Sequence, residues 1–171
     1  MAIREILKRG DPVLGKKAHP VTKFDDKLHD LLDDLNDTLD NAGGAGLAAP
    51  QIGILRRVVV VSNSEDEVIE LINPTIVATE GEQDGLEGCL SVPGYWGFVK
   101  RPMKVRVRAQ DRDGKWFEVE DTAMTARCFA HELDHLDGKL YTEMVDGKLY
   151  TSEEIDEMVE RQRAEQEGKE K

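Results

Sequence analysis

The chain has 171 residues, of which 39% are hydrophobic and 34% are charged, and 23 Lys and Arg against 35 Asp and Glu give a net charge of −12. This length fits one globular domain, and no stretch approaches the roughly 18 consecutive apolar residues that a membrane-spanning helix requires. Because no such stretch is present, we expect no membrane insertion. Because the negative charge repels polyanions, we expect no direct DNA binding.

The first residues show neither a signal-peptide nor a lipidation pattern, so a cytoplasmic location is expected. Cys89 and Cys128 are the two cysteines, which is too few for a disulfide scaffold. In a reducing compartment a cysteine near histidines is a metal ligand, a nucleophile or a buried apolar side chain. The function depends on which of these applies.

Regular spacing predicts the first elements of the chain. Leucines recur at helical intervals from Asp25 to Asp40 and predict an amphipathic helix that stops before Gly43 and Gly44. The β-branched runs 56–62 and 68–74 predict strands, and alternation over 105–120 predicts a hairpin that turns at Asp113 and Gly114.

A second helix is expected to start at Asp121 or Thr122, either of which can cap it, and to run to Leu136 before Gly138 ends it. One face of this helix carries polar and sulfur-containing side chains, and a neighbouring row is apolar. The first face comprises Met124, Cys128, His131 and His135, and the row comprises Phe129, Leu133 and Leu136.

The order of elements predicts an α+β fold, because strands and helices do not alternate as they do around a parallel sheet. We expect mostly antiparallel sheet packed around the central helix at 122–136, with one N-terminal and one C-terminal helix. Residues 1–150 are predicted to form a single catalytic domain and residues 151–171 a charged C-terminal helix or tail.

The segment His131-Glu132-Leu133-Asp134-His135 has the HExxH pattern. Two imidazoles four residues apart lie one helical turn apart and can bind the same ion, while Glu132 can reach a water on that ion without being a ligand. The alternative is a pair of hydrogen-bonded structural histidines on a half-buried helix.

The third ligand is the open question for such a site. No histidine follows His135, although Glu143, Glu153 and Glu154 remain formal candidates downstream. Upstream, Cys89 lies in a turn beside Gly88, where a thiolate could point inward. Cysteine and two histidines with an open water position form a catalytic rather than a closed site. Cys128, one turn before His131, could also be a ligand, but we favour it as pocket lining.

The segment Gly44-Ala45-Gly46-Leu47-Ala48-Ala49-Pro50-Gln51 forms a third cluster. Its glycines allow close backbone approach, but it follows a helix and has no Lys-Ser/Thr pair, so a phosphate loop is excluded. A tight packing turn would be the ordinary interpretation. Gln51 adds a neutral donor that could hydrogen-bond an oxyanion opposite a metal.

These clusters, GAGLAAPQ (44–51), EGCLS (87–91) and HELDH (131–135), together resemble the three signature motifs of the bacterial type of peptide deformylase. The segments ILKRGDPVLGKKAHPV and DHLDGKLY are also similar to that family, so the resemblance covers about residues 3–145.

The resemblance implies that Cys89, His131 and His135 hold one metal ion, with Fe²⁺ as the native ion and Zn²⁺, Ni²⁺ or Co²⁺ able to replace it. It implies that Glu132 is the general acid/base, and that Gln51 and the Leu90 N–H form the oxyanion hole. Metal-hydroxide attack on the formyl carbon would release formate and a free N-terminus from N-formylmethionyl nascent peptides.

We expect Gly44, Gly46 and Leu90 to line a tight site for the formyl group. Met124 and Cys128 would line an apolar pocket for the methionine side chain, with ordinary core packing as an equal alternative.

Among the remaining candidates, Glu87 could orient a metal ligand. Arg101 could meet a substrate carbonyl, although surface ion pairing is slightly favoured for it. Ala130 departs from the family, in which many members carry Gln directly before HExxH.

The resemblance also bears on partners and location. A formylated initiator methionine implies bacteria or an organelle, and the missing transit peptide favours the bacterial cytoplasm. A basic C-terminal helix docks some relatives on the ribosome, but residues 152–171 hold eight acids against four basic residues. Ribosome docking by this tail is therefore weakly supported, and a monomer is expected.

Two alternatives stay open at this point. A zinc endopeptidase of the HExxH type would need an extended cleft and a downstream ligand. A non-catalytic metal-binding protein would close its site with a fourth residue such as Cys128.

Overall fold

The computed structural model describes residues 2–169, which form two antiparallel sheets and three α-helices. The α+β class with mostly antiparallel sheet is therefore confirmed. The helices are α1 (Asp26–Ala42), α2 (Ala123–Leu136) and α3 (Ser152–Lys169), and 3₁₀ turns cover Pro12–Gly15, Ala49–Ile52 and Tyr141–Glu143. The strands are β1 (Gly46–Ala48), β2 (Val58–Ser62), β3 (Val68–Glu80), β4 (Gln83–Cys89), β5 (Val92–Arg101), β6 (Lys104–Gln110), β7 (Trp116–Thr122) and β8 (Asp146–Thr151).

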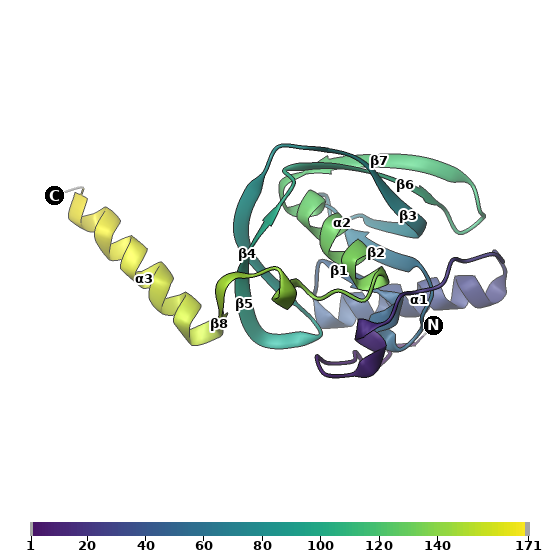
Figure 1. Cartoon of the computed structure of the whole chain (residues 1–171), viewed down its shortest axis with the longest axis horizontal. Coiled ribbons are helices and arrows are strands. Elements are labelled where there is room, and N and C mark those ends of the chain that lie inside the picture. Colours follow the sequence, from purple (N-terminus) through teal and green to yellow (C-terminus); the bar gives the residue numbers. More distant parts are fainter. Residues whose placement is uncertain (1, 170–171) are drawn as a thin grey trace.

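The larger sheet has the order β1-β2-β3-β6-β7 and is covered by α1 on one face and α2 on the other (Figure 1). Strand β2 explains this arrangement, because residues 58–61 are four consecutive valines, all fully buried. Side chains alternate along a strand, so Val58 and Val60 pack with α1, whereas Val59 and Val61 pack with α2. Helix α2 is thereby buried between this sheet and the rest of the molecule.

Helix α1 matches the amphipathic helix predicted from the leucine spacing, and it ends two residues later, at Ala42. The Asp25 side chain accepts a hydrogen bond from the Leu28 N–H and caps the first turn. Gly43 follows with φ +66°, a left-handed conformation that glycine adopts without steric cost. The predicted hairpin is also present, as β6 and β7.

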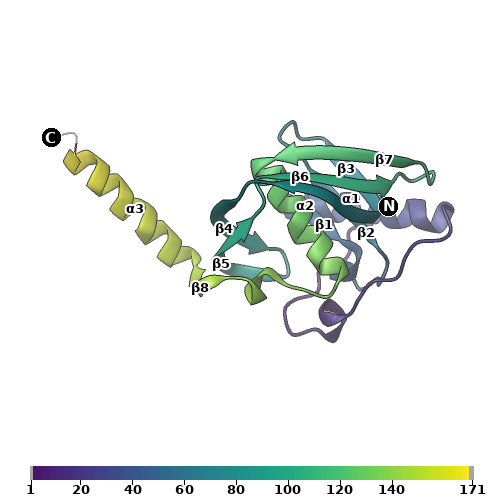
Figure 2. The same cartoon turned by 45° about the horizontal axis from the view of Figure 1, so that its top comes forward.

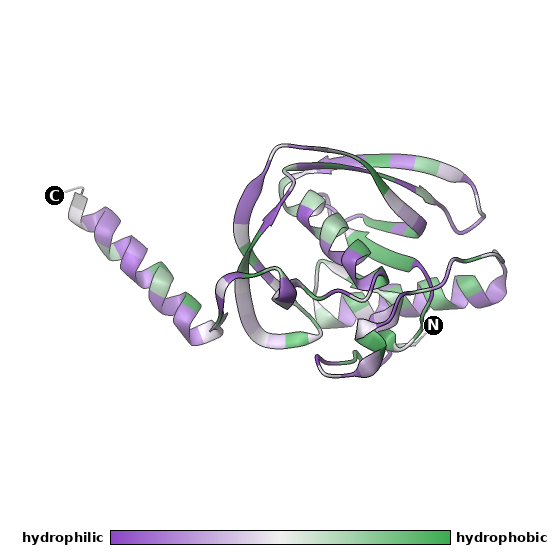
Figure 3. Ribbon diagram, viewed as in Figure 1, coloured by the Kyte–Doolittle hydropathy of each residue, from purple (hydrophilic) through white to green (hydrophobic). Residues whose placement is uncertain are grey.

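Helix α2 spans the predicted range, but its start corrects one expectation. Thr122 occupies the cap position, yet its side chain makes no capping hydrogen bond. The hydropathy colouring shows the mixed character of this helix (Figure 3). Phe129, Leu133 and Leu136 enter the core against the larger sheet, as the apolar row predicts.

The smaller sheet, β4-β5-β8, was not predicted from the sequence. It has its own small core around Val92, Val99 and Tyr141. We expected Cys89 to lie within a turn, but it is the last residue of β4, and Leu90 and Ser91 form the connection to β5. The Cys89 side chain is therefore held by strand pairing with Val92.

Helix α3 projects away from the rest of the molecule (Figure 2). It contacts β5 and β8 only near its beginning. Within residues 2–169, none of the helices has the length and hydrophobicity that crossing a bilayer would require.

Candidate metal centre

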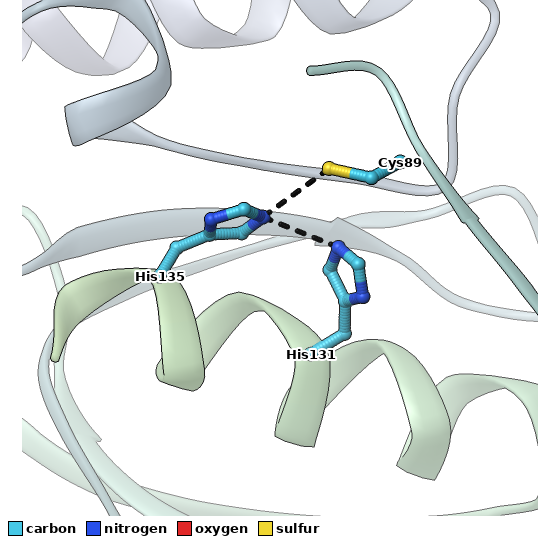
Figure 4. A group of neighbouring side chains, drawn as sticks. All are labelled: Cys89, His131 and His135. Atoms are coloured by element: carbon cyan, nitrogen blue, oxygen red, sulfur yellow. Dashed lines mark hydrogen bonds between the residues drawn. The ribbon is translucent and has the colours of Figure 1, made fainter. Parts of the chain in front are cut away.

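Helix α2 brings the two histidines of the HExxH segment together. His131 and His135 lie one turn apart, and their Nε2 atoms face each other at 3.2 Å (Figure 4). Both residues are buried, because the helix lies between the larger sheet and β5. Two buried nitrogen atoms that point at one another are positioned to share one ion.

The third donor comes from the smaller sheet. Cys89 Sγ lies 3.4 Å from His135 Nε2, and one donor atom each from Cys89, His131 and His135 lie within 4.8 Å of one another. A thiolate and two imidazoles suit Zn²⁺, Fe²⁺ and related ions, so the donor set fits a metal centre. Across residues 2–169, this is the group of metal-binding side chains that the structure brings together, and it includes neither Cys128 nor the downstream glutamates.

Glu132 lies beside the three donors without joining them. Its Oε1 is 3.6 Å from His131 Nε2, and its Oε2 is buried with no hydrogen-bond partner in the described part of the chain. Burial raises the pKa of Glu132 to about 7, because the cost of burying the charged form is larger than the lowering effect of the nearby His131. A carboxyl group whose pKa lies near neutral pH can both accept and return a proton.

Gly46 provides the space for this carboxylate. A side-chain carbon at position 46 would lie 2.9 Å from Glu132 Cγ and 3.3 Å from its Oε2. Gly44 stands in a similar relation to Leu90, whose Cδ1 would lie 2.8 Å from such a carbon. A side chain at either position would therefore displace Leu90 or Glu132.

Glu87 connects the smaller sheet to the histidines. Its Oε1 contacts His131 Nδ1, and Arg101 donates to both carboxylate oxygens, from Nη2 at 2.7 Å and Nε at 3.1 Å. Burial alone would raise the pKa of Glu87, but the hydrogen bonds from His131 and Arg101 lower it to about 2. The anionic carboxylate leaves His131 Nε2 directed at the other donors, which agrees with the predicted orienting role.

The expectations for Arg101 need correction. It is 6% exposed, so it does not form a surface ion pair. Its guanidinium binds Glu87 and, at 2.6 Å, Asp134, and Arg101 is not among the residues that line the cavity. It reaches the metal centre only through Glu87.

Gln51 and Leu90 lie beside Cys89. Gln51 is buried, its Oε1 accepts from the Ala48 N–H, and its Nε2 donates to Ser91 Oγ and lies 3.6 Å from Cys89 Sγ. Leu90 directly follows Cys89 in the connection to β5. Both residues line the cavity in front of the three donors.

The cavity has a volume of about 450 Å³ and is lined mainly by apolar side chains. Gly44, Gly46 and Cys128 belong to its wall, and Met124, 62% exposed, lies at its mouth. Burial raises the pKa of the Cys128 thiol to about 12, so this group stays protonated at neutral pH. A protonated thiol outside the donor cluster fits pocket lining better than metal binding.

Sequence reasoning missed Arg127, Tyr95 and Trp96, which also line the cavity. Tyr95 and Trp96 belong to β5, whose glycine-interrupted sequence gave no strand signal. Arg127 lies between recognised positions of α2, and no local pattern indicates that its side chain is buried. Only the fold reveals its place, beside Gly85, where a side-chain carbon would lie 3.2 Å from Arg127 Nη2.

Comparisons with known proteins agree with this geometry. Residues 3–149 match the family described as "Polypeptide deformylase". A peptide deformylase of Heliobacterium modesticaldum is 55% identical over 146 residues, which cover 85% of this chain and 96% of that protein. One from Lachnoclostridium phytofermentans is 50% identical over 159 residues, or 92% of this chain and 98% of the relative.

Solved structures give the same result. The crystal structure of a peptide deformylase from Legionella pneumophila superimposes with a TM-score of 0.82 at 46% identity, covering 85% of this chain and 87% of the other. That from Thermus thermophilus has a TM-score of 0.81 at 39% identity and covers 95% of both chains.

Proposed function

Because the chain belongs to the polypeptide deformylase family, and removes the N-formyl group from newly made proteins, we propose that Cys89, His131 and His135 form its metal-binding active site. One observation carries this proposal. Three donor atoms from strand β4 and helix α2 converge within 4.8 Å beside the buried, unpartnered Oε2 of Glu132.

The family is metal-dependent, and we propose Fe²⁺ as the native ion, with Zn²⁺, Ni²⁺ or Co²⁺ able to replace it. When bound, the ion would act as a Lewis acid that lowers the pKa of water and polarises the formyl carbonyl. One ion per chain is expected, held by the thiolate and the two Nε2 atoms on the HExxH helix, which serves as the central helix of the fold.

Glu132 moves the proton in this mechanism. Its raised pKa and its distance of 3.6 Å from His131 Nε2 suit a base that removes a proton from the attacking water. After the attack, the same carboxyl returns the proton to the departing amine. The C–N bond of the formamide breaks, and formate and a free N-terminus are released.

Gln51 and the Leu90 N–H stabilise the oxyanion that forms on the formyl oxygen. Gln51 Nε2 faces Cys89 Sγ, and its Oε1 is fixed by Ala48, so the amide donor is held before substrate arrives. Such preorganised donors are typically worth about 10²–10³ in kcat.

The cavity selects the substrate. Gly44 and Gly46 keep the space at the metal centre narrow, which suits the small formyl group and excludes larger acyl groups. We assign Cys128 to the wall and Met124 to the mouth of the pocket for the methionine side chain.

The catalytic unit in this proposal is residues 1–150, with residues 151–171 as an appended, charged helix or tail. The protein acts on N-formylmethionyl nascent peptides, and we propose that it works as a monomer in the bacterial cytoplasm. The ribosome is only a weakly supported partner, because the acidic α3 does not favour docking on ribosomal RNA.

The test is formate release from formyl-Met-Ala-Ser by anaerobically purified, iron-loaded protein, with acetyl-Met-Ala-Ser and metal-stripped protein as controls. We expect formate from the formylated peptide with loaded protein only. Cleavage inside unformylated peptides would instead support the endopeptidase alternative, and no hydrolysis by fully loaded protein would support a non-catalytic metal site.

A further inference from the structure

Arg127 is a buried cation whose role the mechanism above does not explain. It lies on α2, one turn before His131, and its side chain is only 5% exposed. A buried guanidinium is costly unless its charge and its donors are satisfied. Its partners therefore indicate why the position carries arginine.

Both partners of Arg127 belong to the smaller sheet. Its Nη1 donates to Glu87 Oε2 at 2.9 Å and to the Val99 carbonyl oxygen at 2.9 Å. Gly85 leaves room for the guanidinium, because a side-chain carbon there would lie 3.2 Å from Nη2. Arg127 thus ties α2 to β4 and β5 directly beside the metal centre.

Arg101 donates to both oxygens of the Glu87 carboxylate, but it does not bind that carboxylate alone. Its guanidinium is shared with Asp134, at 2.6 Å, on the other side. Arg127 binds only Oε2, whereas Oε1 contacts His131 Nδ1 and accepts from Arg101 Nη2. Arg127 and His131 are on the same face of α2. This one helix therefore carries both the metal-binding imidazole of His131 and the guanidinium that holds Glu87, the hydrogen-bond partner of that imidazole.

We propose that Arg127 is a positioning residue of the deformylation reaction: by holding Glu87 Oε2 it directs Oε1 to His131 Nδ1, and so fixes the ring nitrogen that faces the metal. This inference rests on the proposed metal centre. It deepens that function, because it assigns a role to the second cation of an ion-pair group in which Glu87, Arg101 and Arg127 are buried and Asp134 is partly exposed.

The test measures zinc affinity by competition with a chromophoric chelator, which needs no catalytic activity. For Arg127→Met we expect an affinity about 10–100-fold lower, the usual loss when a partner behind a metal ligand is removed. Arg127→Lys keeps the charge but not the planar fork, so its affinity should lie between those of the wild type and the Met variant.

Arg112→Met is the matched control. Arg112 also binds a glutamate carboxylate, that of Glu70 on β3, but it belongs neither to the cavity wall nor to the donor cluster. Because its side chain is 34% exposed, the Arg112 variant should lose less stability than the Arg127 variant, while zinc affinity stays within about threefold of the wild type. An equal loss of zinc affinity in both variants would show a purely structural effect and overturn the proposal.

A double-mutant cycle tests whether Arg127 acts through Glu87. In a Glu87→Gln background, Arg127→Met should lower zinc affinity by much less than in the wild type. Undiminished loss in that background, or wild-type zinc affinity in Arg127→Met, would overturn the proposal. If Arg127→Met does not fold, Arg127→Lys decides, because wild-type affinity in that variant would also refute it.

The kinetics of fully metal-loaded protein distinguish the positioning role of Arg127 from a substrate-binding role, and from failure of the proposed function itself. Zinc affinity unchanged with a raised KM for formyl-Met-Ala-Ser would make Arg127 a substrate-binding residue and refute the positioning role. Absence of formate release from the wild type would refute the proposed function, whereas the zinc measurements would still decide the role of Arg127.

Discussion

The two walls of the metal centre are built in different ways. Helix α2 supplies His131 and His135 from one turn, and the opposite side of that helix is embedded in the main core. Cys89 comes from the end of β4, in a sheet whose core consists of Val92, Val99 and Tyr141. Helical spacing therefore fixes the positions of His131 and His135 relative to each other, whereas the position of Cys89 depends on how the smaller sheet packs against α2.

The largest expected effect comes from the helix wall, at a residue that binds no metal. Glu132→Gln should lower kcat by about 10²–10⁴-fold while zinc content stays at one per chain, because the amide cannot accept the proton. Formate release and metal analysis on the same sample check this. Glu143→Gln, an exposed glutamate outside the cluster, is the control, and equal activity in both variants would contradict the role of Glu132.

The strand wall is tested with Cys89→Ser. A hydroxyl is a harder and weaker ligand than a thiolate, so zinc affinity should fall by more than the ~10–100-fold that loss of an outer partner costs. Cys128→Ser is the matched control, because its thiol stays protonated and lies outside the donor cluster. Chelator competition measures the zinc affinity of both variants. Weaker zinc binding by the Cys128 variant than by the Cys89 variant would make Cys128 the metal ligand and Cys89 the pocket-lining residue.

The support behind the helix wall is tested with Phe129→Ala. Phe129 is fully buried in the core between α2 and the larger sheet, so the free energy of unfolding should fall by about 3–5 kcal/mol. Trp116→Ala removes an aromatic ring that is 52% exposed and stacks on Arg108, and should cost about 1 kcal/mol or less. Urea titrations measure the free energy of unfolding of both variants. A larger loss in Trp116→Ala than in Phe129→Ala would contradict the placement of the core between α2 and the larger sheet.

The smallest effect is expected beyond the strand wall. A chain that stops after Glu154 keeps β8 and the hydrogen bond from Trp96 Nε1 to Ser152 Oγ, but loses most of α3. We expect kcat/KM within about twofold of the full chain, because the deleted part of α3 makes few contacts. A tenfold loss of kcat/KM in steady-state assays would show that α3 belongs to the catalytic unit.

The same contrast explains what the sequence could predict. Helix α1 and the β6–β7 hairpin follow from leucine spacing and an Asp-Gly turn, which are local signals. Strands β4 and β5 are interrupted by glycines such as Gly88 and Gly97, and consecutive residues at the start of β5 are exposed, so the two strands show no clean alternation.

Two features of the site depended on tertiary structure. The contact of Arg127 with Glu87 joins residues 40 positions apart, and no local spacing indicates it. The burial of Arg101 likewise follows only from the docking of β5 against α2, which is why a surface ion pair was expected instead. The HExxH spacing, in contrast, placed His131 and His135 without any knowledge of the fold.

The projecting α3 also determines how the molecule tumbles. Its 18 residues extend roughly 27 Å at 1.5 Å per residue, from one side of a compact body (Figure 1). Rotational diffusion is therefore anisotropic, and the Stokes radius exceeds that of a sphere of 19.2 kDa. A monomer should elute early in gel filtration, so its mass is properly measured by light scattering or sedimentation equilibrium.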